Sequence, residues 1–150
     1  MNRNQAAVRL ILMLTLVFVL VRCGKKGPPF LPEKEIPYRL NALSVEQQGG
    51  GFHLEGKVVD PRDPARPVPV IEVGRVYHAC YPLDNPPCEN CPIDYGPFRS
   101  VRGEQVGKGR FSCQVPVKAG KGIHFFKIRL IGPEGGIGPF SDRVKIIIHE

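Results

Sequence analysis

The sequence FFKIRLIGPEGGIGPFSD, residues 125–142, carries the strongest indication of how this chain folds. In its first half, aromatic and aliphatic residues alternate with Lys127 and Arg129. Such an alternation is typical of a β-strand that buries one face. The glycine-rich segment that follows favours a turn, because glycine adopts backbone conformations that other residues avoid. We therefore predict two successive strands, at residues 123–131 and 140–148.

Short alternating runs recur after Pro37, and none shows the sustained period of a helix. Further strands are predicted at residues 40–45, 52–59, 70–81 and 110–117. Proline-rich loops at residues 60–69 and 81–99 separate them. The side chains expected to face the core include Phe111, Val115, Val117, Phe126, Ile128 and Leu130. Short strands with such turn signals, in a chain with 17 Gly and 16 Pro, predict an all-β sandwich or small barrel.

The strand at residues 123–131, the glycine-rich turn and the sequence GPFS at residues 138–141 together resemble strands F and G of a fibronectin type III domain. The resemblance extends over residues 38–149 and implies an immunoglobulin-like β-sandwich. Two residues depart from the family pattern. Gly56 stands where a tryptophan is usual, and His124 stands where strand F has a tyrosine. Neighbouring side chains are expected to fill the space beside Gly56.

A second pattern lies at the start of the chain, where two arginines precede the apolar run 10–21 and Cys23 follows it. A basic region and an apolar run are typical of a secretory signal peptide. The cysteine at the cleavage point resembles a bacterial lipoprotein signal, which implies that residues 1–22 are removed and the Cys23 thiol is acylated. Arg22 stands where the peptidase prefers a small residue. One alternative is an uncleaved anchor helix, although the run is shorter than the ~20 residues of a membrane-spanning helix. Another is a buried helix or a wrongly assigned start site.

Residues 23–37 contain four prolines and are predicted to form an extended linker, so that the folded domain covers residues 38–150. Gly24 follows the lipidation cysteine, in place of the Asp that marks inner-membrane retention in many lipoproteins. The resemblance therefore favours the outer membrane of the cell envelope, with the domain facing the periplasm and the membrane contacted through the N-terminal lipid.

The formal net charge of the chain is +7, and it falls to about +4 when the three arginines of residues 1–22 are removed. The remaining basic residues are scattered along the sequence, which indicates a solvated surface. Attraction to anionic lipid headgroups is a sharper alternative. A nucleic-acid partner is not expected of an exported protein.

Four cysteines follow the lipidation site: Cys80, Cys88, Cys91 and Cys113. An even number in an exported chain favours two disulfides, and we prefer the pairs Cys88–Cys91 and Cys80–Cys113. The first pair is also a CxxC motif, so that an envelope redox protein or a zinc-binding protein is the alternative. Prolines on both sides of the motif predict a loop instead of the helix start that lowers a thiol pKa. We expect neither a metal nor a cofactor.

Catalytic signatures are missing from the sequence, since the histidines lie in separate predicted strands and no Gly-x-Ser-x-Gly or His-Glu-x-x-His occurs. Asp60 and Asp63 are of a residue type that binds calcium, but the prolines around them favour a plain loop. We therefore do not expect an enzyme.

The loop at residues 82–98 is the longest interruption of the strand pattern, and loops of that length are usually functional or disordered. Tyr95 and Phe98 are aromatic residues within an otherwise polar and proline-rich segment. They either cover the edge of the sandwich or contact a partner. The sequence as a whole predicts a lipid-anchored binding or structural module that acts through contacts with another, unknown envelope protein.

Overall fold

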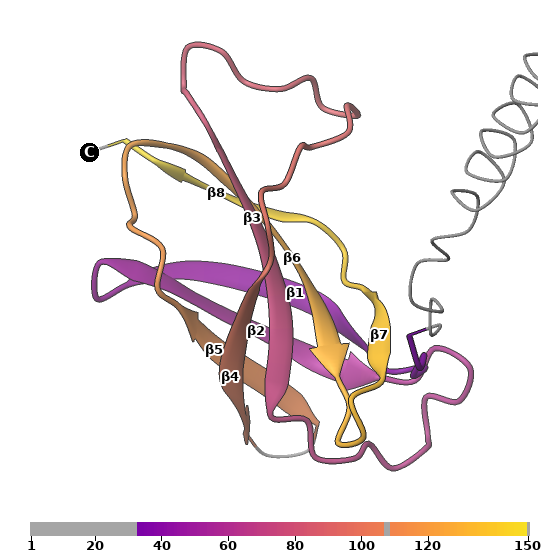
Figure 1. Cartoon of the computed structure of the whole chain (residues 1–150). Helices are drawn as coiled ribbons and strands as arrows, with labels where there is room; N and C mark the ends of the chain where they lie inside the picture. Colours follow the sequence, from indigo (N-terminus) through magenta and orange to yellow (C-terminus); the bar gives the residue numbers. More distant parts are fainter. Residues whose placement is uncertain (1–32, 107–108, 150) are drawn as a thin grey trace, which may run out of the picture. The chain divides into compact units, whose positions relative to one another are not determined.

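The structure, a computed structural model, describes residues 33–106 and 109–149 (Figure 1). This part of the chain contains eight β-strands, paired antiparallel, and no helix. The strands are β1 (Arg39–Gln48), β2 (Gly51–Val59), β3 (Val73–Tyr81), β4 (Arg99–Val106), β5 (Arg110–Val115), β6 (Gly122–Ile131), β7 (Ile137–Phe140) and β8 (Val144–Ile148). The prediction of an all-β fold is confirmed. The predicted signal peptide, Cys23 and most of the predicted linker lie outside the described residues.

Among the described residues, no helix is long and apolar enough to cross a membrane.

The strands form two layers that β4 connects. β1, β2 and β5 lie side by side in one layer, and β3 and β6 pair in the other, where β7 and β8 both pair with β6. Residues 99–102 of β4 pair with β3, and residues 103–106 pair with β5. β4 therefore passes from one layer to the other, and the order along the sheet is β1-β2-β5-β4-β3-β6-β7. Figure 1 shows the two layers crossing each other.

The core lies between the layers and contains the predicted side chains. Phe126, Ile128 and Leu130 of β6 are each 0% exposed, and Phe111 and Val115 of β5 are at most 1% exposed. Val117 follows β5 and is only partly buried against the same cluster. Burial of each large apolar side chain contributes about 1.5–3 kcal/mol, so the β6 face predicted from alternation is a principal source of stability.

Glycines make room for the ring of Phe111, which crosses the core. Gly56 of β2 pairs directly with Phe111. A Cβ on Gly103 would lie 2.3 Å from the Phe111 Cζ atom, and a Cβ on Gly74 would lie 3.5 Å from it. The Cβ position of Gly56 is met by the Leu40 side chain, at 3.3 Å. The Leu40 side chain thus fills the space beside Gly56.

The structure differs from the predicted strands in two places. No strand was predicted for the segment that forms β4, whose apolar residues do not alternate; Val101 is its buried apolar residue at 6% exposure. Of the predicted strand 140–148, residues 144–148 form β8, whereas Phe140 ends β7, which begins earlier at Ile137. Ser141 lies between the two strands, and its Oγ accepts a hydrogen bond from the Ile128 amide at 3.0 Å. The Ser141 amide donates to the Ile128 carbonyl at 2.9 Å. This exchange maintains contact with β6 where the edge strand is interrupted.

The end of the predicted linker belongs to the folded unit, which begins at Glu33. The Ile36 amide donates to the Ile137 carbonyl at 3.1 Å, and the Ile137 amide donates to the Lys34 carbonyl at 2.7 Å. Residues 33–37 therefore extend along β7, and the boundary of the domain lies before the predicted residue 38.

Candidate binding surface

The loop at residues 82–98, here called the cysteine loop, is attached to the outer face of the layer that contains β3 and β6. The Asp94 amide donates to the Tyr81 hydroxyl at 3.2 Å, and the Gly96 amide donates to the His78 carbonyl at 3.3 Å. The Arg143 guanidinium donates to the carbonyl of Glu89 at 2.7 Å and to that of Cys91 at 3.3 Å. Although it has no strand or helix, the loop is held to the sheet at several points.

The four cysteines fall into one disulfide and two free thiols. Cys88 and Cys91 are joined, in agreement with the preferred local pairing. The predicted Cys80–Cys113 pair is not formed. Cys80 is exposed on β3, whereas Cys113 is buried on β5 in the other layer, where burial raises its pKa to about 12. In the described part of the chain, no group of three His, Cys, Asp or Glu residues could hold a metal ion.

Aromatic rings from strands and loop meet on this outer face. Tyr77 of β3 lies between Phe98 of the cysteine loop, with ring centroids 5.9 Å apart, and Phe140 of β7, at 5.1 Å. Phe98 and Phe140 each remain 44% exposed, and they are two of the four exposed large hydrophobic residues among those described. Tyr95 is partly buried beside them, and its hydroxyl has no hydrogen-bond partner there.

Basic side chains lie over the same rings. The Arg75 guanidinium is 4.5 Å from the Phe98 ring centroid, and the Arg129 guanidinium is 5.0 Å from that of Phe140. The Lys127 ammonium is 5.6 Å from the Phe140 centroid and 5.8 Å from that of Tyr95. Cation–π contacts of this kind are worth about 0.5–1 kcal/mol at exposed sites. We call this surface the cation–aromatic face; it consists of Arg75, Tyr77, Tyr95, Phe98, Lys127, Arg129 and Phe140.

Two hollows lie next to this face, one on each side of Arg143. The aromatic hollow, about 520 Å³, is lined by Tyr77, Tyr95, Phe140, Lys127 and Arg143 together with Asp142 and residues 90–93. The basic hollow, about 530 Å³, is lined by Pro87, Cys88, Glu89, Phe125, Arg143 and Lys145. Both volumes are in the range of ligand pockets. Arg143 lines both hollows, and its guanidinium lies 5.6 Å from the Phe125 ring centroid.

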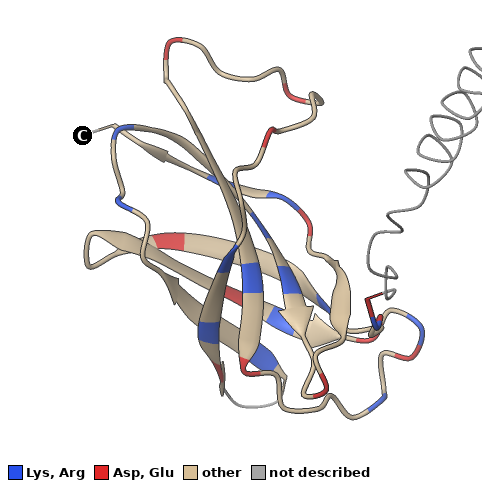
Figure 2. Cartoon of the chain, viewed as in Figure 1, with Lys and Arg blue, Asp and Glu red and all other residues tan. Residues whose placement is uncertain are grey.

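Positive charge predominates on this side of the molecule. Figure 2 shows Lys and Arg on neighbouring strands of the layer, while several acidic residues lie in loops. Arg75 is paired with Glu33, at 3.3 Å. Among the described residues, Lys127, Arg129, Arg143 and Lys145 have no carboxylate within ion-pair distance. The surface therefore offers uncompensated cations beside exposed aromatic rings.

A pair of histidines lies on the inner side of the same layer. His78 Nε2 is 2.9 Å from His124 Nδ1, and His124 Nε2 is 2.7 Å from the Gly120 carbonyl oxygen. A carbonyl only accepts, so His124 Nε2 carries the proton and its Nδ1 accepts from His78. Burial, together with the nearby His124 and Arg99, lowers the pKa of His78 to about 4. His124 is thus a buried residue, at 1% exposure, that bonds within the protein.

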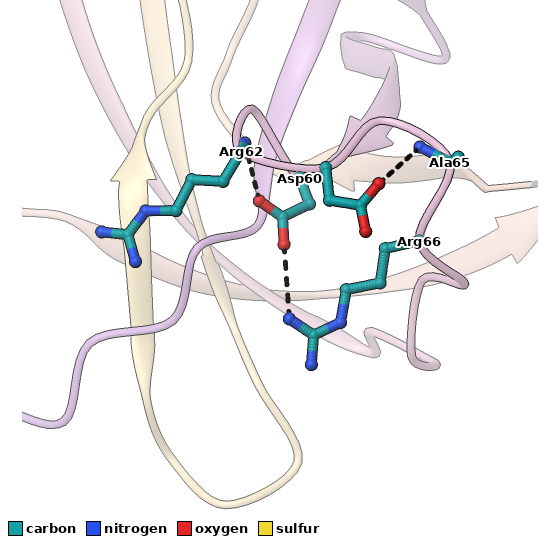
Figure 3. Close-up of polar contacts among 5 residues, drawn as sticks. Asp60, Arg62, Ala65 and Arg66 are labelled. Carbon is teal, nitrogen blue, oxygen red and sulfur yellow. Dashed lines mark hydrogen bonds and ion pairs between the residues drawn. The ribbon is translucent and has the colours of Figure 1, made fainter.

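The carboxylates of Asp60 and Asp63 interact with residues of their own loop (Figure 3). Asp60 is 2% exposed, and its carboxylate accepts a hydrogen bond from the Arg62 amide at 2.9 Å and lies 3.7 Å from the Arg66 guanidinium. The Asp63 carboxylate accepts from the Ala65 amide at 3.3 Å. These bonds are typical of aspartates that stabilise turns, in line with the plain loop predicted for this segment.

The comparisons with known proteins add little to this geometry. No protein-family model matches the chain, and no curated protein matches it. A solved structure entitled "Myokine structure" is similar with a TM-score of 0.42 and 10% sequence identity, over 77% of this chain and 100% of that chain.

Sequence reasoning identified part of this surface. Tyr95 and Phe98 were singled out by their composition, and the structure places both on the cation–aromatic face. Tyr77 and Phe140 were missed, although a signal existed, because residues that alternate with core positions on a strand must face outward. Arg143 was missed as well, since its contacts join residues more than 50 positions apart.

Proposed function

We propose that this protein is a non-enzymatic binding module of the bacterial cell envelope, that it is held there by lipid on Cys23, and that it acts through protein contacts at the cation–aromatic face. The observation that carries the proposal is the exposure of Phe98 and Phe140, 44% each, on a surface that also presents cations. Aromatic and arginine side chains are enriched at the centres of protein interfaces. Exposed rings of this size, beside a hollow, are therefore better explained by a partner than by stability.

The proposed fold is a fibronectin type III-like sandwich, and the strand arrangement supports it. β1, β2 and β5 take the places of the family's strands A, B and E, while β4, β3 and β6 take those of C′, C and F. β7 and β8 together take the place of strand G. This fold hosts many binding roles, so the function rests on the surface and not on the architecture.

The envelope location rests on the sequence, namely on the apolar run and Cys23. A Cys23→Ala variant should accumulate as an unlipidated precursor, because it lacks the thiol that would be acylated. Intact-mass measurement of the wild-type protein should show an acyl addition. A wild-type mass without acyl chains would refute the lipid anchor and favour an uncleaved helix.

Cross-linking in intact envelopes, followed by pull-down, tests the binding surface. A variant with both Phe98→Ser and Phe140→Ser should lose the cross-linked partner while it keeps a cooperative unfolding transition. Ile147→Ser is a matched control, because Ile147 is also 44% exposed but lies on β8, outside the face. Retention of the same partner by the double variant would refute the surface, as would its loss from the Ile147 control.

The redox alternative is favoured by one observation, the exposed Cys88–Cys91 disulfide in a loop. A redox protein would exchange this disulfide rapidly with added thiols. Titration under mild reduction separates the two proposals. Fast, reversible opening, together with loss of activity toward a thiol substrate in the Cys88→Ser variant, would favour redox chemistry. A disulfide that resists mild reduction would favour the binding module.

A further inference from the structure

We infer that the partner presents an extended acidic segment that carries one large apolar side chain. The apolar side chain enters the aromatic hollow, and the carboxylates beside it bind Arg143 and Lys145 at the basic hollow. This inference rests on the proposed function, since it specifies what binds at that surface.

Arg143 is a cation that lines both hollows. Its guanidinium donates to two backbone carbonyls, those of Glu89 and Cys91, and both acceptors are neutral. A guanidinium has five N–H donors, so these two bonds fix its orientation and leave further donors available. The contact with the Phe125 ring also restrains its plane. An arginine held in this way is prepared to bind a carboxylate with two parallel hydrogen bonds.

Two acidic residues line the hollows, but three cations, Lys127, Arg143 and Lys145, outnumber them. Asp142 lines the aromatic hollow and Glu89 lines the basic hollow. Neither carboxylate is within ion-pair distance of a cation in the described part of the chain. Lys145 adds a second exposed cation to the basic hollow. The complementary ligand is consequently anionic at this end.

The aromatic hollow favours an apolar group at the other end of the ligand. Tyr77, Tyr95 and Phe140 line it, and apolar side chains in aromatic-lined pockets are common anchors of protein interfaces. The exposed rings are not flat platforms for sugars. Tyr77 meets Phe140 edge-on at 63°, and Arg129 and Lys127 already cover the Phe140 ring. A polypeptide, in which an apolar residue stands next to acidic ones, supplies both features.

The spacing of the hollows supports an extended segment. They have similar volumes, about 520 and 530 Å³, and share Arg143 as a common wall. Successive side chains of an extended chain point to opposite sides, so the side chains of residues i and i+2, about 6.6 Å apart, share one side. Residues two positions apart in such a segment can therefore reach both hollows, which a single small anion cannot do.

The test uses the full-length protein in detergent and a five-residue synthetic peptide with phenylalanine between two pairs of glutamates. NMR amide shifts on titration should move in residues 90–95 and 141–145. A peptide in which glutamine replaces every glutamate should bind at least about tenfold more weakly, because a hydrogen bond to a charged group contributes about 1.5–3 kcal/mol. A peptide in which alanine replaces phenylalanine should also bind more weakly, because it lacks the apolar side chain that enters the aromatic hollow. Equal binding of the neutral peptide would overturn the inference.

Protein variants locate the binding. Arg143→Gln and Lys145→Gln should each weaken binding of the acidic peptide by about tenfold. Lys118 is an exposed lysine outside both hollows, so Lys118→Gln should leave the peptide affinity unchanged. Vesicles of anionic phospholipid are the competing occupant. If the vesicles shift residues 90–95 and 141–145 and the peptide does not, the inference fails in favour of a lipid surface.

The two proposals can fail separately. If no peptide binds but the double variant at Phe98 and Phe140 still loses its cross-linked partner, the binding surface stands and the acidic segment is wrong. If the partner is retained as well, both proposals are wrong.

Discussion

The two faces of the layer built on β3 and β6 come from the same strands but have opposite characters. On the inner face, Phe126, Ile128 and Leu130 are fully buried and contact the second layer. On the outer face, Lys127 and Arg129 stand between those residues and contact Phe140. A single alternating strand thus supplies two faces with different roles. Inner positions determine the free energy of unfolding, and outer positions are available for recognition.

The largest expected effect compares two phenylalanines on opposite faces. Phe126→Ala should lower the free energy of unfolding by about 3–5 kcal/mol, because it leaves a cavity in a closely packed core. Phe140→Ala should cost only about 1 kcal/mol, since the ring is 44% exposed and loses mainly its cation–π and edge contacts. Urea denaturation of both variants measures the difference. Equal losses would show that the outer face is as important for stability as the core.

A second prediction concerns the space that glycine leaves for Phe111. Gly103→Ala should destabilise the domain by about 1–3 kcal/mol, as overpacking does, because its Cβ would lie 2.3 Å from the Phe111 ring and 2.6 Å from the Ser112 carbonyl oxygen. Gly120→Ala is the matched control, since nothing lies within 4 Å of its Cβ position. A melting temperature of the Gly103 variant equal to that of the control would mean that the ring of Phe111 does not occupy this space.

The third prediction uses pH to test the histidine pair, His78 and His124, on the inner face. Because the pKa of His78 is lowered from 6.5 to about 4 in the folded state, the unfolded chain binds a proton more readily. The contribution of His78 to stability is therefore complete above pH 6.5 and is lost as the pH falls toward 4. Partial exposure reduces this loss to about 1–2 kcal/mol.

The His78→Gln variant removes the titrating group and keeps a donor for His124. Between pH 7 and pH 4.5, the wild-type protein should lose about 1–2 kcal/mol more stability than this variant. Measurement of urea midpoints at both pH values yields this double difference directly. Parallel pH profiles of the two proteins would contradict the assignment of His78.

The sequence predicted those parts of the molecule in which one strand face is continuously apolar. The inner faces of β2 and β6 followed from alternation, and both are buried as expected. β4 could not be predicted in this way, because it turns the corner between the layers and buries little apolar surface besides Val101. At the break between β7 and β8, Ser141 bonds to Ile128 of β6, a long-range contact that no local pattern encodes.

The candidate site was predictable only where its residues were unusual for their segment. Tyr95 and Phe98 differ from the polar loop around them, and the Cys88–Cys91 pair has a local spacing. The failed Cys80–Cys113 pairing and the position of Arg143 depend instead on which strands become neighbours. Such long-range geometry is decided by the packing of whole layers, which spacing in one sequence does not specify.

The smallest expected effect on stability is at the cations of the outer face, and it tests directly whether the two faces of the layer have different roles. Lys127→Gln combined with Arg129→Gln should change the free energy of unfolding by less than about 1 kcal/mol, because partly exposed cations over aromatic rings contribute little. If the outer face is for recognition, the same variant should nevertheless retain less of the cross-linked partner. Measuring unfolding and partner retention on the same variant separates the two roles, since substitution of a core residue would lower both stability and partner retention. A loss of several kcal/mol, with the partner retained, would assign Lys127 and Arg129 to the stability of the domain and remove them from the proposed surface.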